Sequence, residues 1–209
     1  MAAPLAERLR PRTLDDYIGQ KHLVGQDAVL RKMIDSGHIS SFILWGPPGV
    51  GKTTLAQIIA HRLETPFYTL SAVTSGVKDV REVIEKAKNN RFFSQNSPIL
   101  FIDEINCVSE TLAPTMLQFL QCKTFGNQQV PKGWIIVAAG NPSEYNKSVR
   151  EFDMVTLDRV RKIDVDADFN IWKEYAVNHH INRAIINYLE LRPNNFYKVE
   201  ADIDGMQFV

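Results

Sequence analysis

The nine residues GPPGVGKTT, at positions 46–54, have the composition and spacing best suited to chemistry in this sequence. They fit the pattern G-x-x-x-x-G-K-[ST], in which glycines let the backbone curl until successive N–H groups point into a phosphate-sized hollow. Lys52 would then place a cation against the β- and γ-phosphates of a nucleotide, and the Thr53 hydroxyl would coordinate Mg²⁺. The candidate cofactor-binding residues are Gly46, Pro47, Pro48, Gly49, Val50, Gly51, Lys52, Thr53 and Thr54. The alternative is a plain glycine turn that happens to include Lys-Thr.

Two adjacent acids, Asp103 and Glu104, are the second feature, and they directly follow the apolar residues 99–102. Asp103 could hold Mg²⁺ together with Thr53, while Glu104 could polarise the water that attacks the γ-phosphate. We expect the strand formed by residues 99–102 to lie beside the strand that ends at Trp45. Without the glycine-rich segment, the same two acids would more often be a solvated strand end.

Two further polar residues could complete such a site. Asn141 ends the apolar run WIIVAAG and could hold the attacking water or the γ-phosphate through its amide. The alternative for Asn141 is an ordinary Asn-Pro turn. Arg159, in VTLDRVRKIDV, could reach a nucleotide bound to a neighbouring subunit and neutralise charge in the transition state. The alternative for Arg159 is a surface arginine in a salt bridge.

The apolar pattern predicts strands that alternate with helices. Continuous apolar runs, which suit strands buried on both faces, occur in SFILWG, PFYTLSA, PILFI and WIIVAAG, with a shorter one in KIDV. Between them, KTTLAQIIAHRLE, VKDVREVIEKAKNN and ETLAPTMLQFLQC are predicted to be helices. This alternation predicts an α/β fold with a three-layer core, in which a mostly parallel sheet carries helices on both faces. Because ligands bind at the carboxyl ends of such strands, we expect Gly46, Asp103 and Asn141 on one rim.

The sequence changes character from about residue 167. The segment FNIWKEYAVNHHINRAIINYLEL predicts two helices around a turn at residues 178–180. We therefore divide the chain into a nucleotide-binding core, residues 1–166, and a partial helical lid or appendage, residues 167–209. His179 and His180 are interpreted as the end of a helix rather than as a pair of metal ligands.

Composition restricts the classes of protein that need to be considered. The chain has 24 basic and 24 acidic residues, so its net charge gives no general attraction to DNA or to an anionic membrane. Its apolar runs are too short to span a bilayer, and its first residues lack the apolar core of a secretory signal. Cys107 and Cys122 are too few for a disulfide framework. These features predict a cytoplasmic protein with reduced thiols and no membrane partner.

Together these motifs resemble the AAA+ ATPase superfamily. Residues 46–53 resemble its Walker A loop, residues 99–104 its Walker B strand, Asn141 its sensor 1 and Arg159 its arginine finger. The resemblance covers nearly the whole chain. It implies ATP or ADP and Mg²⁺ as cofactors, hydrolysis of ATP to ADP and phosphate, and self-association into a hexameric ring if the assembly regions suffice. The implied catalytic residues are Glu104, Asn141 and Arg159, and the implied metal ligands are Thr53 and Asp103.

Two halves of the chain resemble different branches of that superfamily. Residues 4 to about 104 resemble the replication-associated recombination protein A family in PLAERLRPRTLDDYIGQKHLVG, SFILWGPPGVGKTTLAQIIA and SAVTSGVKDVREVIEKA. That resemblance implies that Tyr17 and Ile18 contact the adenine, and it admits DNA as a partner, against which the neutral charge argues. From about residue 98, FIDEINCVSETLAPTMLQFLQ, GWIIVAAGNPSEYN and VTLDRVRKIDV resemble MoxR-type ATPases of the dynein-related AAA group. The changeover near residues 98–105 predicts a fusion, designed or accidental; the alternative is one divergent natural family.

The expected function is therefore an ATP-binding AAA+ ATPase core with weak hydrolysis. The reason for weak hydrolysis is that the resemblance implies a lid carrying a second sensor arginine, and no clear match to it precedes Val209. The alternative is a non-catalytic nucleotide-binding scaffold, or a chimera of two AAA+ halves without cellular activity. A GTP-specific switch is disfavoured, because NKSV at Asn146 lacks the aspartate that would recognise guanine.

Overall fold

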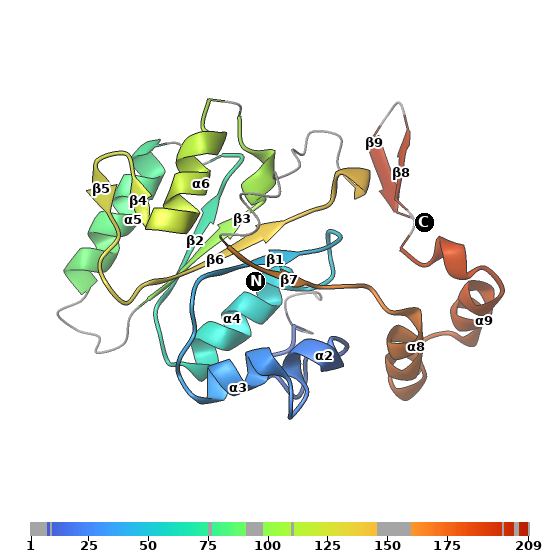
Figure 1. Cartoon of the computed structure of the whole chain (residues 1–209). Helices are drawn as coiled ribbons and strands as arrows, with labels where there is room; N and C mark the ends of the chain where they lie inside the picture. The colour runs from blue at the N-terminus through green and yellow to red at the C-terminus, as the bar shows by residue number, and fades with distance from the viewer. Residues whose placement is uncertain are drawn as a thin grey trace.

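A five-stranded parallel sheet forms the centre of the protein (Figure 1). The computed structural model describes residues 8, 10–74, 77–90, 98–109, 111–145, 160–197, 199–202 and 205–208. The strands of the sheet are β1 (Phe42–Trp45), β2 (Phe67–Ser71), β3 (Ile99–Asp103), β6 (Ile135–Gly140) and β7 (Arg161–Asp164). They lie in the order β2-β3-β6-β1-β7, and every neighbouring pair is parallel. All five coincide with strands that the apolar pattern predicts.

The position of β6 corrects one expectation about neighbours. β6 pairs with β1, where Trp45 is opposite Gly140, and with β3, where Ile102 is opposite Ala138. The strand that carries the two acids is therefore separated from β1 by β6, and the prediction that these two strands are adjacent is wrong. Both β3 and β6 are continuous apolar runs, so their pattern does not reveal which of them takes the place beside β1.

Helices cover both faces of the sheet, which confirms the predicted three-layer α/β fold. On one face, α4 (Lys52–Arg62) and α3 (Val29–Asp35) pack against alternate strand residues such as Ile99 and Phe101. On the other face, α5 (Val77–Asn90) and α6 (Ala113–Cys122) pack against Leu100 and Ile102. All four strand residues are fully buried. Burial on both faces explains why the strands are continuously apolar rather than alternating.

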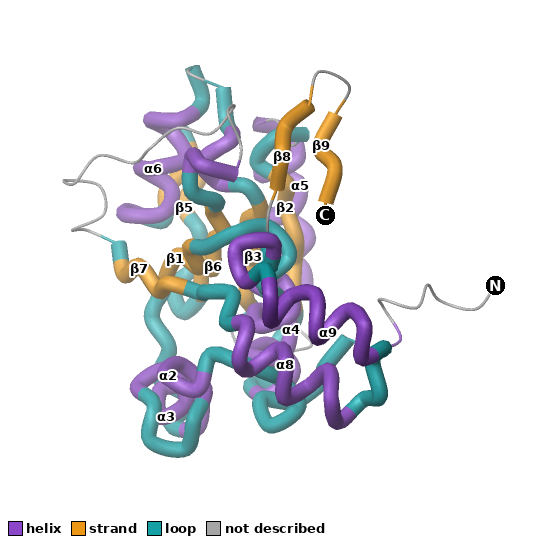
Figure 2. The backbone as a smooth tube through the Cα atoms, turned by 90° about the vertical axis from the view of Figure 1, so that its right-hand side faces the viewer, coloured by secondary structure: helices purple, strands orange, loops and turns teal. Residues whose placement is uncertain are grey.

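Two helices follow the sheet and lie beside one another, away from the core (Figures 1 and 2). α8 (Phe169–Asn178) begins at Asp168, whose carboxylate accepts hydrogen bonds from the N–H groups of Asn170 and Ile171. His179 caps its C-terminal end, and α9 (Arg183–Leu191) begins after the turn. These bounds agree with the predicted pair of helices, and His179 lies at a helix end as interpreted.

The remaining elements are short. They are α2 (Lys21–Val24), the 3₁₀ turns η1 (Ile105–Cys107), η2 (Ser143–Tyr145) and η3 (Pro193–Asn195), and the hairpins β4–β5 (Thr124–Phe125, Gln128–Gln129) and β8–β9 (Val199–Asp202, Gly205–Phe208). The sequence pattern predicts neither hairpin, since strands of two to four residues are too short to show a period. Cys107 and Cys122 form no disulfide within the part of the chain that the structure describes. Within the described ranges, no helix has both the length and the apolar character that crossing a membrane requires.

Candidate nucleotide-binding site

The glycine-rich segment forms a tight turn between β1 and α4. Gly49 and Gly51 have φ angles of 82° and 92°, in the left-handed region that favours glycine. At Gly46 the constraint is steric, because a Cβ atom there would lie 2.0 Å from the carbonyl oxygen of Val165. The turn leads directly into α4, which begins at Lys52. The N–H groups at the start of this helix and its positive end make the turn a suitable place for an anion.

Lys52 is buried in this turn, with 7% of its surface exposed. Its Nζ donates three hydrogen bonds of 2.7 Å each, to the carbonyl oxygens of Gly46 and Pro47 and to Oδ1 of Asn141. Burial lowers the pKa of Lys52 to about 8, while the charges of Asp103 and Glu104 act in the opposite direction. The ammonium therefore uses its three protons on oxygens at the strand tips, and it lies within electrostatic reach of both acids.

The two acids lie where β3 turns away from the sheet. Asp103 is the last residue of β3, and its Oδ1 accepts a 3.0 Å hydrogen bond from the N–H of Glu104. Glu104 has φ 52° and ψ 42°, a left-handed conformation that is uncommon outside glycine and is concentrated at functional sites. Asp103 and Thr53 are both half-buried. A half-buried carboxylate and hydroxyl are the kind of oxygen ligands that Mg²⁺ takes, so the chemistry of these residues fits the metal.

Asn141 lies just beyond β6 and is held there by a residue that the sequence analysis did not select. Asn106, in η1, donates from Nδ2 to the carbonyl oxygen of Asn141 at 2.7 Å, and its Oδ1 accepts from the N–H of Asn141 at 3.1 Å. Asn106 is 1% exposed. The sequence signal for it is a polar residue within the otherwise apolar positions that follow the acids. The structure thus brings Gly46, Lys52, Asp103, Glu104 and Asn141 to one rim of the sheet.

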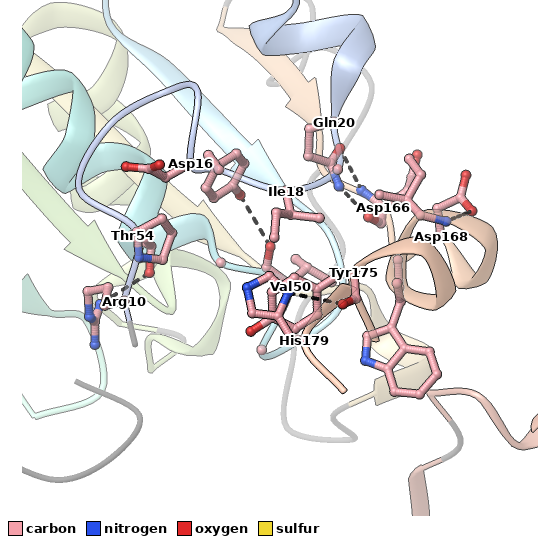
Figure 3. A pocket seen from close by; sticks show the side chains of 18 of the residues that line it. Arg10, Asp16, Ile18, Gln20, Val50, Thr54, Asp166, Asp168, Tyr175 and His179 are labelled. Carbon is pink, nitrogen blue, oxygen red and sulfur yellow. Dashed lines mark hydrogen bonds between the residues drawn. The ribbon is translucent and has the colours of Figure 1, made fainter. Parts of the chain in front are cut away.

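A cavity of about 1110 Å³ opens beside the turn (Figure 3). Its wall includes Gly49, Val50, Gly51 and Thr54 from the glycine-rich segment, and Tyr17 and Ile18 from the N-terminal segment. Tyr17 is 7% exposed, and its hydroxyl donates to the carbonyl oxygen of Val50 at 3.2 Å. Burial raises the pKa of Tyr17 to about 12, so its hydroxyl stays protonated near neutral pH. Ile18 is 49% exposed and lines the cavity.

Aromatic residues of the C-terminal part complete this wall. Trp172 and Tyr175 of α8 line the cavity together with Phe196 and Tyr197, which follow α9. Trp172 and Phe196 are in contact, with ring centroids 5.5 Å apart. None of the four was predicted from the sequence. Trp172 and Tyr175 have helical spacing, which is typical of a packed helix face as well as of a ligand site, and Phe196 and Tyr197 lie outside any regular pattern. A cavity of this size, with aromatic and charged side chains in its wall and the glycine-rich turn beside it, can hold a nucleoside.

Charged and amide groups connect the segments around the cavity. Arg10 donates from Nη1 to Oγ1 of Thr54 and to Oε1 of Gln57, each at 3.2 Å. Gln20 donates from Nε2 to the carbonyl oxygen of Asp166, and its Oε1 accepts from the N–H of Asp166 at 3.3 Å. The N-terminal segment is thereby attached to both α4 and the start of the C-terminal part. Arg159 lies outside the described residues.

Residues 42–159 match the family described as "ATPase family associated with various cellular activities (AAA)". The chain belongs to the AAA family. The matched range begins at β1 and includes the glycine-rich turn, the acids and Asn141.

Known proteins resemble this AAA chain over different lengths. Replication-associated recombination protein A of Haemophilus influenzae is 48% identical over 118 residues, which are 56% of this chain and 26% of that protein. An uncharacterized protein of Thermotoga maritima is 34% identical over 223 aligned residues, covering 98% of this chain and 35% of that protein. The solved RuvB Holliday junction branch migration motor of Thermotoga maritima matches with a TM-score of 0.56 and 25% identity, over 79% of this chain and 52% of that one. This AAA chain thus spans about a quarter to a third of the two curated relatives.

Proposed function

We propose that this chain is the nucleotide-binding core of an ATPase that hydrolyses ATP to ADP and phosphate with Mg²⁺. The observation that carries the proposal is the buried ammonium of Lys52, held at the glycine-rich turn by three oxygens and within reach of the charges of Asp103 and Glu104. A buried lysine is stable as a cation only with such oxygen partners, and phosphate oxygens can replace them. Membership of the AAA family supports ATP as the nucleotide.

Each residue on the rim has a proposed task. The turn and Lys52 bind the phosphates, Asn141 orients the γ-phosphate or the attacking water, and Glu104 accepts a proton from that water as it attacks. Thr53 and Asp103 would hold Mg²⁺, which when bound supplies positive charge against the phosphate oxygens. Tyr17 and Ile18, together with the aromatic wall, exclude water from the base. Little covalent chemistry is required of the protein, so positioning and charge suffice.

Weak turnover of the separate chain belongs to the same proposal. Arg159 is proposed to act on nucleotide bound to a neighbouring subunit in a hexameric ring, so a monomer would lack its charge. We propose residues 1–166 as the core and residues 167–209 as a partial lid, whose helix α8 lines the base cavity.

The cellular role is proposed from the relatives alone. Their names refer to replication-associated recombination and to branch migration of Holliday junctions, which supports a role in DNA processing. The net charge of zero gives this chain little general attraction for DNA, so we expect DNA contacts to depend on assembly or on other regions. The proposed change of family near residues 98–105 remains a proposal as well. One relative aligns across it over 98% of the chain, which favours the single-family alternative.

The direct test is the substitution Glu104→Gln, which keeps the shape of the side chain and removes its basicity. We expect kcat to fall by about 100-fold or more, the usual range for loss of a general base, with ATP affinity nearly unchanged. Steady-state phosphate release and a fluorescent-nucleotide titration measure the two quantities. The matched control is Glu82→Gln, an exposed glutamate on α5 that should change neither.

The possible results separate the two candidate functions. Equal turnover in the unsubstituted chain and in Glu104→Gln would refute the role of Glu104. Nucleotide binding without turnover above background in either protein would favour the scaffold. In that case nucleotide should still raise the melting temperature, because it binds only the folded state.

A further inference from the structure

The residue that follows the acids by two positions makes an unusual pair of contacts. Asn106 uses both ends of its side-chain amide on the main chain of Asn141, donating to its carbonyl oxygen at 2.7 Å and accepting from its N–H at 3.1 Å. Both groups are buried, with 1% of Asn106 and 8% of Asn141 exposed. The contacts also fix which way the amide points, since only one orientation gives a donor to the carbonyl and an acceptor to the N–H.

These two hydrogen bonds lie beyond the last paired residues of β3 and β6. β3 and β6 are paired up to Ile102 and Ala138, and the next residues of β3 turn away through the left-handed Glu104. The amide of Asn106 then occupies the place of a neighbouring strand for Asn141. Space around it is limited, because a Cβ atom at Gly140 would lie 3.1 Å from Oδ1 of Asn106. The main chain of Asn141 is therefore held by η1, the turn that directly follows Asp103 and Glu104.

The side chain of Asn141 continues the chain of contacts. Its Oδ1 accepts the 2.7 Å hydrogen bond from Nζ of Lys52, so the three residues form a continuous buried series from η1 to the glycine-rich turn. Each member is held by a partner that cannot move without leaving a buried polar group unsatisfied. The position of the acids and the position of Asn141 are consequently linked through Asn106.

We propose that Asn106 is a positioning residue that holds the Asn141 amide where it acts on the γ-phosphate and the attacking water. This inference rests on the proposed ATPase function. It predicts that the effect of Asn106 on catalysis passes through Asn141: loss of Asn106 releases the main chain of Asn141, and the amide at its tip no longer keeps its place. Small displacements of this kind reduce catalysis with little effect on ground-state binding of ADP.

The test is a double-mutant cycle of Asn106→Ala and Asn141→Ala, with kcat and the affinities for ATP and ADP measured for all four proteins. We expect Asn106→Ala to lower kcat by roughly tenfold to 100-fold, as for a misplaced catalytic group, and to change ADP affinity by less than about twofold. In the Asn141→Ala background the same substitution should lower kcat by less than about twofold further, since residues that act as a unit are not additive. Asn127→Ala, an exposed asparagine between β4 and β5, is the matched control and should leave kcat unchanged.

Additive losses of kcat in the double variant would overturn the proposal, because they would show that Asn106 acts independently of Asn141. If Asn106→Ala fails to fold, Asn106→Leu keeps a similar volume, removes both hydrogen bonds and should give the same non-additive loss. If the unsubstituted chain binds ATP without turnover, the proposed function fails separately. The cycle is then read from the ratio of ATP affinity to ADP affinity in place of kcat. Each single variant should lower this ratio, and the double variant should lower it no further than Asn141→Ala alone. An unchanged preference in Asn106→Ala would then refute the inference.

Discussion

At both the phosphate end and the base end of the proposed nucleotide site, a side-chain amide pairs with the main chain of another residue, but the surroundings differ. At the phosphate end, the side-chain amide of Asn106 pairs with both main-chain polar groups of Asn141. At the base end, the side-chain amide of Gln20 pairs in the same way with Asp166. The first pair lies among strands of the central sheet. The second joins the N-terminal segment to the start of the C-terminal helices, two segments 146 positions apart in the sequence.

The difference lies in what surrounds each pair. The phosphate end is closed: Lys52 is 7% exposed and hydrogen-bonded to three oxygens, two in the turn between β1 and α4 and one on Asn141, just beyond β6. The base end is a cavity of about 1110 Å³ between segments that pack outside the sheet (Figure 3). We infer that the phosphate end is organised before nucleotide binds, whereas the base end depends on how α8 and the residues after α9 close over it.

The largest effect is expected at the closed end. Lys52→Ala removes the cation and leaves the oxygens of Gly46, Pro47 and Asn141 without it. Because we propose that Nζ bonds the phosphates when ATP binds, its loss should also cost about 3 kcal/mol of binding free energy, which is a fall of roughly 100-fold in ATP affinity. Fluorescent-nucleotide titration measures this fall, and a given ATP concentration should raise the melting temperature by less than in the unsubstituted chain.

The control for this substitution is Lys86→Ala, which removes an exposed lysine that pairs only weakly with Glu82 on α5. Its ATP affinity should equal that of the unsubstituted chain. A Lys52→Ala protein that binds ATP as tightly as the control would show that the phosphates bind elsewhere, and the contrast between the two ends would lose its basis.

An intermediate effect is expected at the open end. Trp172→Ala removes an aromatic ring from the cavity wall and from its contact with Phe196. If the ring stacks on the base, its loss should reduce the affinities for ATP and ADP equally, by about tenfold, the usual worth of one stacked base. At saturating ATP, kcat should stay the same, because the ring contacts no reacting atom. A selective loss for ATP would place Trp172 near the γ-phosphate instead.

The smallest effect is expected at the amide that connects the two segments of the base end. Gln20→Ala leaves the N–H and carbonyl groups of Asp166 without this partner. We expect the free energy of unfolding to fall by about 1–2 kcal/mol, and nucleotide affinity to fall by only about two- to fivefold, because water can reach the half-open site. Urea unfolding and nucleotide titration measure these values. A loss of affinity as large as that of Lys52→Ala would mean that the base end, too, must be fixed before binding.

The same contrast explains what the sequence could predict. The strands and helices of the core were predictable because burial on both faces requires long apolar runs, as in β3 and β6. The rim was predictable because Gly46, Asp103 and Asn141 lie at or just after the ends of predicted strands. The order of β3, β6 and β1 was not, since identical apolar patterns do not distinguish neighbours. Asn106 was missed because its partners are main-chain atoms of Asn141, which have no signature in a sequence. The cavity wall at Trp172 was missed because its residues come from segments that are far apart in the sequence and meet only in the folded chain.

The central claim is that Lys52 exchanges its protein oxygens for phosphate oxygens. The most direct measurement is a crystal structure of the chain with Mg²⁺ and a non-hydrolysable ATP analogue. The account predicts that the phosphates lie in the glycine-rich turn, that Nζ of Lys52 contacts their β- and γ-oxygens and has left the carbonyl oxygens of Gly46 and Pro47, and that the base lies in the cavity beside Tyr17. A structure in which Lys52 keeps all three of its present oxygens while the analogue binds elsewhere would contradict it.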